Sequence, residues 1–349
     1  MKTTFISTSY ISAATRSSLM KVQAELAEAQ KEMTTGRFAD VGKTLGFQTG
    51  QSISLRQEHA RLTTITETNS IVSTRLEASQ ASLTTLVSSA ESFVGQLLAS
   101  SIDGANASVL KTQAASGLDG FIDTTNTSLN NAYLFAGVNT DAKPITDYYE
   151  TPAPANKAAV DAAFLAHFGF TQSDPNVANI TAADMTNFLD TTFAAVFDDP
   201  AWTTNWSSAS DQNVRNRIST NELIETSVNA NDQAFRKMAM AYTMIADLGL
   251  EGLGDAAYET VVNRAVSVSN EAIYDFSGLQ AKLGVAQQRT TDASERMSIQ
   301  LDILATQVTT LEGVDRNEAA VRVYELLTQM ESSYALTARI MGLSILNEI

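Results

Sequence analysis

The 349-residue chain contains no cysteine, which excludes disulfide bonds, thiol catalysis and cysteine-ligated metal sites. It is also poor in positive charge, because 23 Lys and Arg residues stand against 39 Asp and Glu residues and give a formal net charge of -16. A protein this acidic lacks the basic stripe that nucleic-acid phosphates require, and anionic membrane surfaces would repel it. The composition therefore predicts that nucleic acid is not a partner.

Long apolar runs are also missing. No stretch reaches the length of a membrane-spanning helix, and the first ten residues show neither the apolar segment nor the cleavage site of a secretory signal peptide. We therefore expect no membrane insertion, and either a cytoplasmic protein or one exported without a cleaved signal. Aromatic residues make up only 7% of a chain that is 44% hydrophobic, which favours long, thin helical bundles over a thick globular core.

Proline is scarce and confined to one part of the chain. All five prolines lie between residues 144 and 200. Because proline breaks helix interiors, we expect the proline-free flanks to be helical and the centre to be different. Trp202 and Trp206 follow the last proline, and phenylalanines are frequent nearby, which predicts a folded module with its own aromatic core.

Apolar residues in both flanks follow the alternating three- and four-residue spacing of coiled coils. One polar residue, Asn69, occupies a core-type position, where such a residue more often fixes helix register than carries chemistry. The four apolar seams run over residues 19–33, 62–97, 262–311 and 323–341, and each predicts a helix. The second helix is expected from about Ser52 to near Gly104, and the third is expected to start near Asp255.

Shorter elements are expected between the seams. Residues 36–51 contain four glycines, which suits an irregular stretch or a small hairpin. Residues 214–228 favour strands, and residues 232–248 favour another helix.

The two flanks mirror each other, since a short helix precedes a long one before the centre and follows a long one after it. The simplest packing pairs the first and last helices and sets the two long helices side by side. We predict a mainly α fold: an antiparallel long-helix bundle with coiled-coil terminal helices and a small inserted mixed α/β module. The predicted domains are a terminal coiled-coil domain of residues 1–35 and 312–349, a long-helix bundle domain of residues 36–140 and 213–311, and an inserted outer module of residues 141–212.

No pattern in the sequence indicates catalysis. The chain has two histidines, no His-Glu-x-x-His spacing and no Gly-x-Ser-x-Gly motif, so we predict no enzyme, no cofactor and no metal site. His59 is expected on a solvated helix face, His167 in local packing, and Asp198 and Asp199 in a turn. Two other classes stay open, a helical signalling rod and an enzyme housed in the insert.

Four segments resemble the flagellin family. They lie at the exit of the first helix, at the end of the first half, before the last helix and at the C-terminal end. The second segment is the most specific, because it contains Tyr133, Leu134, Phe135, Ala136 and Gly137 in a row. The four segments are residues 26–38, 131–140, 311–315 and 339–347.

The resemblance implies an extracellular structural subunit of the bacterial flagellum, exported without a cleaved signal peptide. Residues 344–349 are similar to the ends of family members that join hook to filament, and residues 5–9 depart from the start common in filament flagellins. The implied function is to join hook to filament, with a filament flagellin as the alternative. The implied partners are copies of the chain itself, a hook-side junction protein, a filament-side flagellin or second junction protein, and a flagellar export chaperone.

Subunit contacts are expected at the terminal helices. Two helices that pair alone leave apolar residues uncovered, and neighbouring subunits could cover them. The expected assembly interface comprises Leu19, Val22, Leu26, Met33, Leu327, Met330, Tyr334, Ile340, Met341, Leu343 and Ile345.

Overall fold

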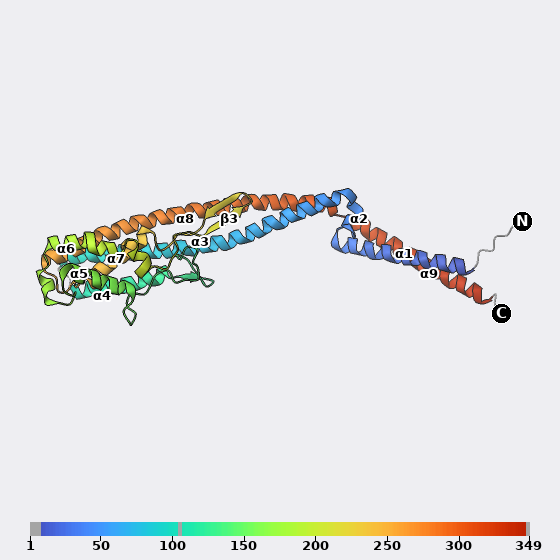
Figure 1. Cartoon of the computed structure of the whole chain (residues 1–349). Helices are drawn as coiled ribbons and strands as arrows, with labels where there is room; N and C mark the ends of the chain where they lie inside the picture. Colours follow the sequence, from blue (N-terminus) through green and yellow to red (C-terminus); the bar gives the residue numbers. More distant parts are fainter. Residues whose placement is uncertain (1–7, 104–106, 347–349) are drawn as a thin grey trace. The chain divides into compact units, whose positions relative to one another are not determined.

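The computed structural model describes residues 8–103 and 107–346 (Figure 1). At residues 8, 9, 11, 12, 100–103 and 340–346 it describes the backbone alone. The chain divides into two compact units. Unit 1 contains residues 1–64 and 297–349, and unit 2 contains residues 65–296.

Unit 1 is built on the antiparallel pair of helices α1 (Thr8–Thr35) and α9 (Arg316–Leu346). The direction follows from two cross-helix hydrogen bonds, because Gln23 contacts Tyr334 while Glu32, further along α1, contacts the earlier Arg322. The beginning of α3 (Thr49–Asp103) and the end of α8 (Asp255–Glu312) complete the unit. The expected pairing of the first and last helices is therefore confirmed.

The segment between α1 and α3 differs from the expected irregular stretch or hairpin. It forms α2 (Val41–Leu45) and the short 3₁₀ helix η1 (Gly46–Gln48). Asp40 starts α2, because its carboxylate accepts a hydrogen bond from the backbone N–H of Lys43 at 2.9 Å. A carboxylate cap of this kind stabilises a helix start that four nearby glycines obscure in the sequence.

In unit 2 the long helices α3 and α8 lie antiparallel, with Gln80 donating to the Gln280 carbonyl oxygen at 2.8 Å. The Asn69 side chain donates to Ser294 of α8 at 3.0 Å and to the carbonyl oxygen of Ile218 at 2.9 Å. Asn69 is buried, so a shift of either helix along the other would leave its amide without partners. This geometry fits the register-fixing role expected for it.

Two further helices pack in unit 2, α4 (Ala107–Thr125) and α7 (Gln233–Asp247). The sequence predicted α7 but not α4. The two approach closely at Gly117, where a Cβ atom would lie 2.5 Å from the Tyr242 ring. The buried face of α4 repeats at helical spacing through Leu110, Ala114, Leu118, Phe121, Ile122 and Thr125.

Two small antiparallel hairpins lie in unit 2. Strands β1 (Ser128–Leu129) and β2 (Ala132–Tyr133) are joined by Asn130 and Asn131, which both have positive φ, as the tightest hairpin turns require. Strands β3 (Arg215–Ser219) and β4 (Glu222–Glu225) form the second hairpin, which confirms the strands expected within residues 214–228.

The inserted segment has the expected aromatic core. Trp202 and Trp206 are fully buried and stack with their ring centroids 5.5 Å apart, and Phe197 lies 5.1 Å from Trp206. The segment consists of short helical elements: α5 (Ala155–Phe168), η2 (Pro175–Asn179), α6 (Ala182–Phe188), η3 (Leu189–Phe193), η4 (Ala194–Val196) and η5 (Trp202–Trp206).

The mainly helical class is confirmed, with packed long helices, contacting terminal helices and small two-stranded sheets inserted between them. The strands flank residues 141–212, and within that segment the described backbone has one extended pairing, a bridge between Ile145 and Ser207. The division into three domains stays a prediction. None of the described helices is long and apolar enough to cross a membrane.

Candidate assembly surfaces

The pair of terminal helices α1 and α9 has a small apolar core. Val22, Leu26 and Ala29 of α1 are buried against Val323 and Leu326 of α9, and partly buried Met33, Leu327 and Met330 pack on this cluster. Few large side chains contribute among those that the structure describes, so this part of the pair buries little apolar surface for two helices of 28 and 31 residues.

The residues expected at the assembly interface differ in how exposed they are. Val22 and Leu26 are buried inside the subunit, and Leu19 is half-buried. Tyr334 is 48% exposed, and its hydroxyl accepts a hydrogen bond from Gln23 at 3.0 Å. Leu326 is a core residue that the sequence analysis missed, because the heptad continues through its neighbour Leu327 instead. The side chains of Ile340, Met341, Leu343 and Ile345 lie outside the described residues.

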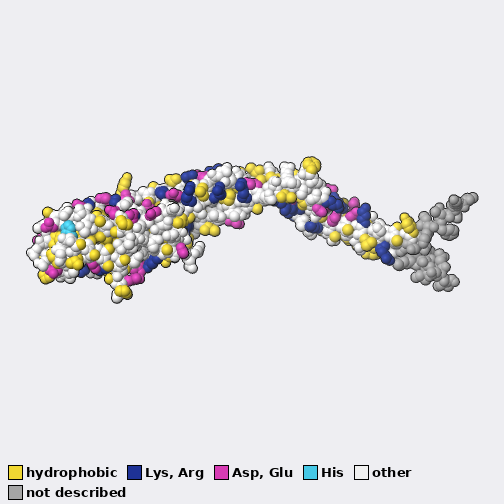
Figure 2. All heavy atoms as spheres, viewed as in Figure 1, with side chains coloured by type: hydrophobic (Ala, Val, Ile, Leu, Met, Phe, Trp, Pro, Cys, Tyr) yellow, Lys and Arg dark blue, Asp and Glu magenta, His cyan; other side chains and the backbone are white. Residues whose placement is uncertain are grey.

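Among the described residues, the surface of α1 and α9 carries large apolar side chains that belong to neither apolar core cluster. Figure 2 shows yellow side chains on the surface of this helix pair. Tyr324 is 72% exposed and Val321, one turn earlier, is 57% exposed. Apolar groups gathered on one helical surface indicate a site of protein contact. The other members of this exposed set are Tyr10, Met20 and Leu336.

A buried carboxylate organises the end of unit 1 where α8 passes into α9. The Glu312 side chain is 1% exposed and accepts hydrogen bonds from Arg37, Arg56 and Ser52. The Arg56 Nε–Oε1 distance is 2.8 Å. Two guanidinium groups and a hydroxyl from the α1–α3 segment thus converge on one residue of α8, which compensates the cost of burying its charge.

Backbone contacts reinforce this cluster. Helix α1 ends at Thr35, and the next residue, Gly36, has a positive φ of 69°, which suits the left-handed residue that closes many helices. The Gly36 carbonyl oxygen accepts from the Val314 N–H at 3.0 Å, and the Phe38 N–H donates to the Glu312 carbonyl oxygen at 3.0 Å. Glu32 accepts from the Ala39 N–H at 3.1 Å. The start of α9 is consequently fixed against the end of α1.

The segment Tyr133–Gly137 packs inside unit 2. Leu134, Phe135 and Ala136 are fully buried, and the Phe135 ring lies 5.3 Å from the Phe235 ring of α7. Its backbone is held on both sides, because Leu134 N–H donates to Thr127 and the Phe135 carbonyl accepts from Ala230. The conspicuous apolar pattern of this segment therefore serves packing within the subunit.

The position of Gly137 leaves no room for a side chain. Its φ is +62°, and a Cβ atom would lie 2.4 Å and 2.6 Å from the carbonyl oxygens of Ser210 and Gln212. We expect Gly137→Ala to destabilise unit 2 by at least about 2 kcal/mol in chemical denaturation, because it adds backbone strain to a clash with rigid backbone. The matched control is Gly120→Ala in α4, where a Cβ meets open space and should be neutral or stabilising. Equal effects of the two substitutions would contradict this account.

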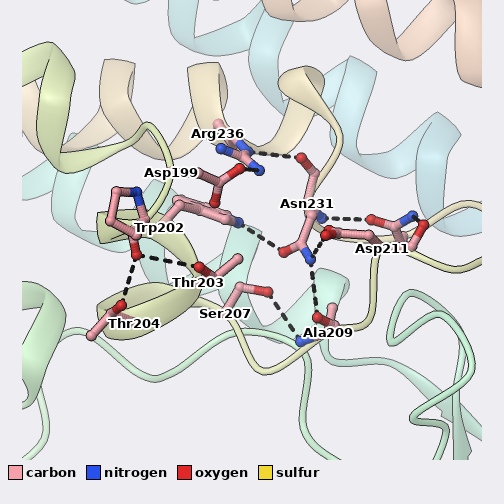
Figure 3. Close-up of polar contacts among 11 residues, drawn as sticks. Asp199, Trp202, Thr203, Thr204, Ser207, Ala209, Asp211, Asn231 and Arg236 are labelled. Carbon is pink, nitrogen blue, oxygen red and sulfur yellow. Dashed lines mark hydrogen bonds and ion pairs between the residues drawn. The ribbon is translucent and has the colours of Figure 1, made fainter.

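The insert is tied to the start of α7 by a polar network (Figure 3). The Trp202 indole donates to Asn231 at 3.0 Å, and Arg236 donates to Asp199 at 2.8 Å while its guanidinium lies over the Trp202 ring. Asn231 also donates to Asp211 at 2.7 Å. The turn expected around Asp198 and Asp199 is therefore an anchor as well, because Asp199 neutralises a buried arginine.

A second charged contact ties the insert to the end of α7. Lys157 of α5 lies 2.8 Å from both Asp161 and Asp247, and the Tyr148 hydroxyl donates to Asp247 at 2.6 Å. Burial raises the pKa of Asp247, although its hydrogen bonds with Lys157 and Tyr148 oppose the change. Burial alone would lower the pKa of Lys157, but its hydrogen bonds to Asp161 and Asp247 raise it. The contact between Lys157 and Asp247 therefore holds α5 against the end of α7, with each charge facing an opposite charge.

One of the two histidines packs among aromatic rings, and the other lies on a partly exposed helix face. His167 lies 3.1 Å from the Thr192 hydroxyl and contacts the Phe168 and Phe188 rings, as expected. His59 is partly exposed on α3. Within the described residues, no group of three or more His, Asp or Glu side chains is placed to hold a metal ion.

The two helical flanks of the chain match known protein-family regions. Residues 6–140 match the bacterial flagellin N-terminal helical region, and residues 266–347 match the bacterial flagellin C-terminal helical region. Together the matches cover more than half of the chain, and the chain belongs to the flagellin family. This is a family of structural, non-enzymatic proteins. Residues 141–265 lie outside both matches.

A solved structure has the same fold over most of its length. It is a protein from Vibrio parahaemolyticus, provisionally described as a flagellar hook-associated protein, with 9% sequence identity and a TM-score of 0.53. The similarity covers 76% of this chain and 97% of that chain. A comparison with curated proteins found no match.

Proposed function

We propose that the chain is the flagellar subunit that joins the hook to the filament. The observation that supports this most is the fold shared over 97% of the length of the Vibrio parahaemolyticus protein described as hook-associated. The C-terminal residues 344–349, which resemble the ends of junction proteins, agree with it. A filament flagellin of the same family is the second candidate, because the flagellin matches at both flanks fit it equally.

We also propose that copies meet through the terminal helices. The support is the combination of a small α1–α9 core with exposed Val321 and Tyr324 on the surface of α9. On this proposal the partners are copies of the chain, a hook-side junction protein, a filament-side flagellin or second junction protein, and an export chaperone. The subunit would act outside the cell.

A deletion strain tests the proposed function. We expect cells that keep their hooks, lose their filaments and release flagellin into the medium, as seen by electron microscopy and by analysis of the culture supernatant. Normal filaments would contradict both candidates. Filament loss with no flagellin left to secrete would favour the filament subunit.

Complementation of that strain tests the assembly surface. The variant Tyr324→Glu should fail to restore filaments, because it places a charge on an exposed apolar contact surface. The matched control is Tyr274→Glu, which changes a tyrosine of unit 2 that is 80% exposed. Restoration by both variants would remove Tyr324 from the interface.

A further inference from the structure

A cavity of about 800 Å³ opens on unit 1 beside the buried Glu312. Its size falls in the range of binding pockets, and apolar atoms make up more of its exposed lining than polar atoms do. The apolar part of the wall comes from Ala305, Val308 and Val314. The polar part of the wall comes mainly from Arg37, Arg56, His59, Glu312 and Arg316.

The charges in this cavity do not balance. Arg37 and Arg56 both contact Glu312, so one carboxylate serves two guanidinium groups. Arg316 lies against Gly36, where a Cβ atom would come within 2.7 Å of its Nε atom. The guanidinium of Arg316 forms no hydrogen bond or ion pair with any residue that the structure describes. The lining therefore carries three guanidinium groups against one carboxylate, and these four groups sum to a charge of +2.

This positive cavity belongs to an acidic protein whose negative charge is concentrated elsewhere. Unit 2 contains 27 acidic and 12 basic residues, a net charge of -15, whereas unit 1 contains 12 acidic and 11 basic residues. When copies assemble, carboxylates of neighbouring copies are the most abundant groups that complement Arg316. The apolar wall suits a carboxylate that stands among apolar side chains on a helix.

We propose that this cavity receives an Asp or Glu side chain from a second copy of the chain, with Arg316 as its ion-pair partner. The proposal rests on the proposed function, since it requires copies to lie side by side in a flagellum. Arg37 and Arg56 hold Glu312 in place and supply the remaining positive field. The guanidinium of Arg316 is free to form a bidentate contact with the incoming carboxylate.

Site-specific photo-crosslinking on assembled flagella tests this proposal. A benzophenone-bearing phenylalanine derivative is placed at Ala305, an exposed residue of the cavity wall, and flagella are sheared from irradiated cells. We expect crosslinked dimers of the chain, with mass spectrometry locating the second attachment in a peptide that contains Asp or Glu. Adding Arg316→Gln should lower the dimer yield about tenfold, because a charged contact across the interface is lost.

The matched control is Arg61→Gln, which removes an exposed arginine of α3 whose ion pair with Glu58 lies outside the cavity. It should leave the dimer yield unchanged. Thermal unfolding of the purified Arg316→Gln chain should match the original, because the guanidinium has no hydrogen-bond or ion-pair partner among the described residues. A large drop in thermal stability would show instead that Arg316 acts in folding.

The outcomes separate this proposal from the proposed function. Absence of the chain from sheared flagella would contradict the function itself. Three outcomes would overturn the proposal that a second copy supplies the carboxylate, while leaving the proposed function intact. They are presence of the chain without crosslinks, equal effects of the two arginine variants, and crosslinks to a different flagellar protein.

Discussion

Truncating Trp202 to alanine should lower the free energy of unfolding of unit 2 by about 3–5 kcal/mol. The indole is fully buried, stacks on Trp206 and donates to Asn231 at 3.0 Å. Its removal opens a cavity among rings and leaves the Asn231 amide oxygen without its donor, so two costs add. Chemical denaturation of the full chain, followed by far-ultraviolet circular dichroism, measures the change.

Two further variants make this expectation testable even where the alanine variant fails to fold. Trp202→Phe keeps part of the ring volume and should cost less than Trp202→Ala. Tyr274→Ala removes an aromatic ring of the same unit that is 80% exposed, and it should change stability by no more than about 0.5 kcal/mol. A Trp202→Ala effect as small as that of Tyr274→Ala would show that the aromatic core is not a stabilising element.

Replacing Glu312 with alanine should destabilise unit 1 by about 2–3 kcal/mol. The substitution removes the one acceptor that Arg37, Arg56 and Ser52 share. The two arginines are 45% and 44% exposed, so water can partly compensate them, and the loss stays below that of a fully buried ion pair. Hydrogen exchange with mass spectrometry should show faster exchange at the end of α8 and the start of α9.

The control for this substitution is Glu318→Ala. That residue also pairs with an arginine, Arg322, but its side chain is 71% exposed and its loss should cost no more than about 0.5 kcal/mol. If both variants exchange alike, the buried carboxylate does not hold α9 in place, and the backbone contacts of Gly36 and Phe38 must suffice.

Elements governed by local spacing could be predicted from the sequence. The apolar seams located both long helices, Gly36 marked the end of α1, and the apolar and polar pattern of residues 232–248 identified α7. Local signals suffice there, because each helix presents one continuous apolar face to a neighbour.

Features that depend on distant contacts could not be predicted. Helix α4 was missed because Gly117 and Gly120 disguise it, and the reason for Gly117 is the ring of Tyr242, far along the chain. Glu312 lies within a segment that resembles the family, yet its burial depends on Arg56, which is 256 residues earlier. The choice of Leu326 over Leu327 as a core residue is set by the crossing of α1 and α9, which a heptad alone does not define.

The antiparallel pairing of α1 with α9 also constrains the order in which the subunit matures. Gln23 and Tyr334 are separated by 311 residues, so the contact forms only after nearly all of the chain has been synthesised. Unit 2 ends at residue 296, so its residues are all made before the last helix. A chain that stopped before α9 would lack the partner of α1. Competence to assemble through this pair thus reports that synthesis has run through the last helix.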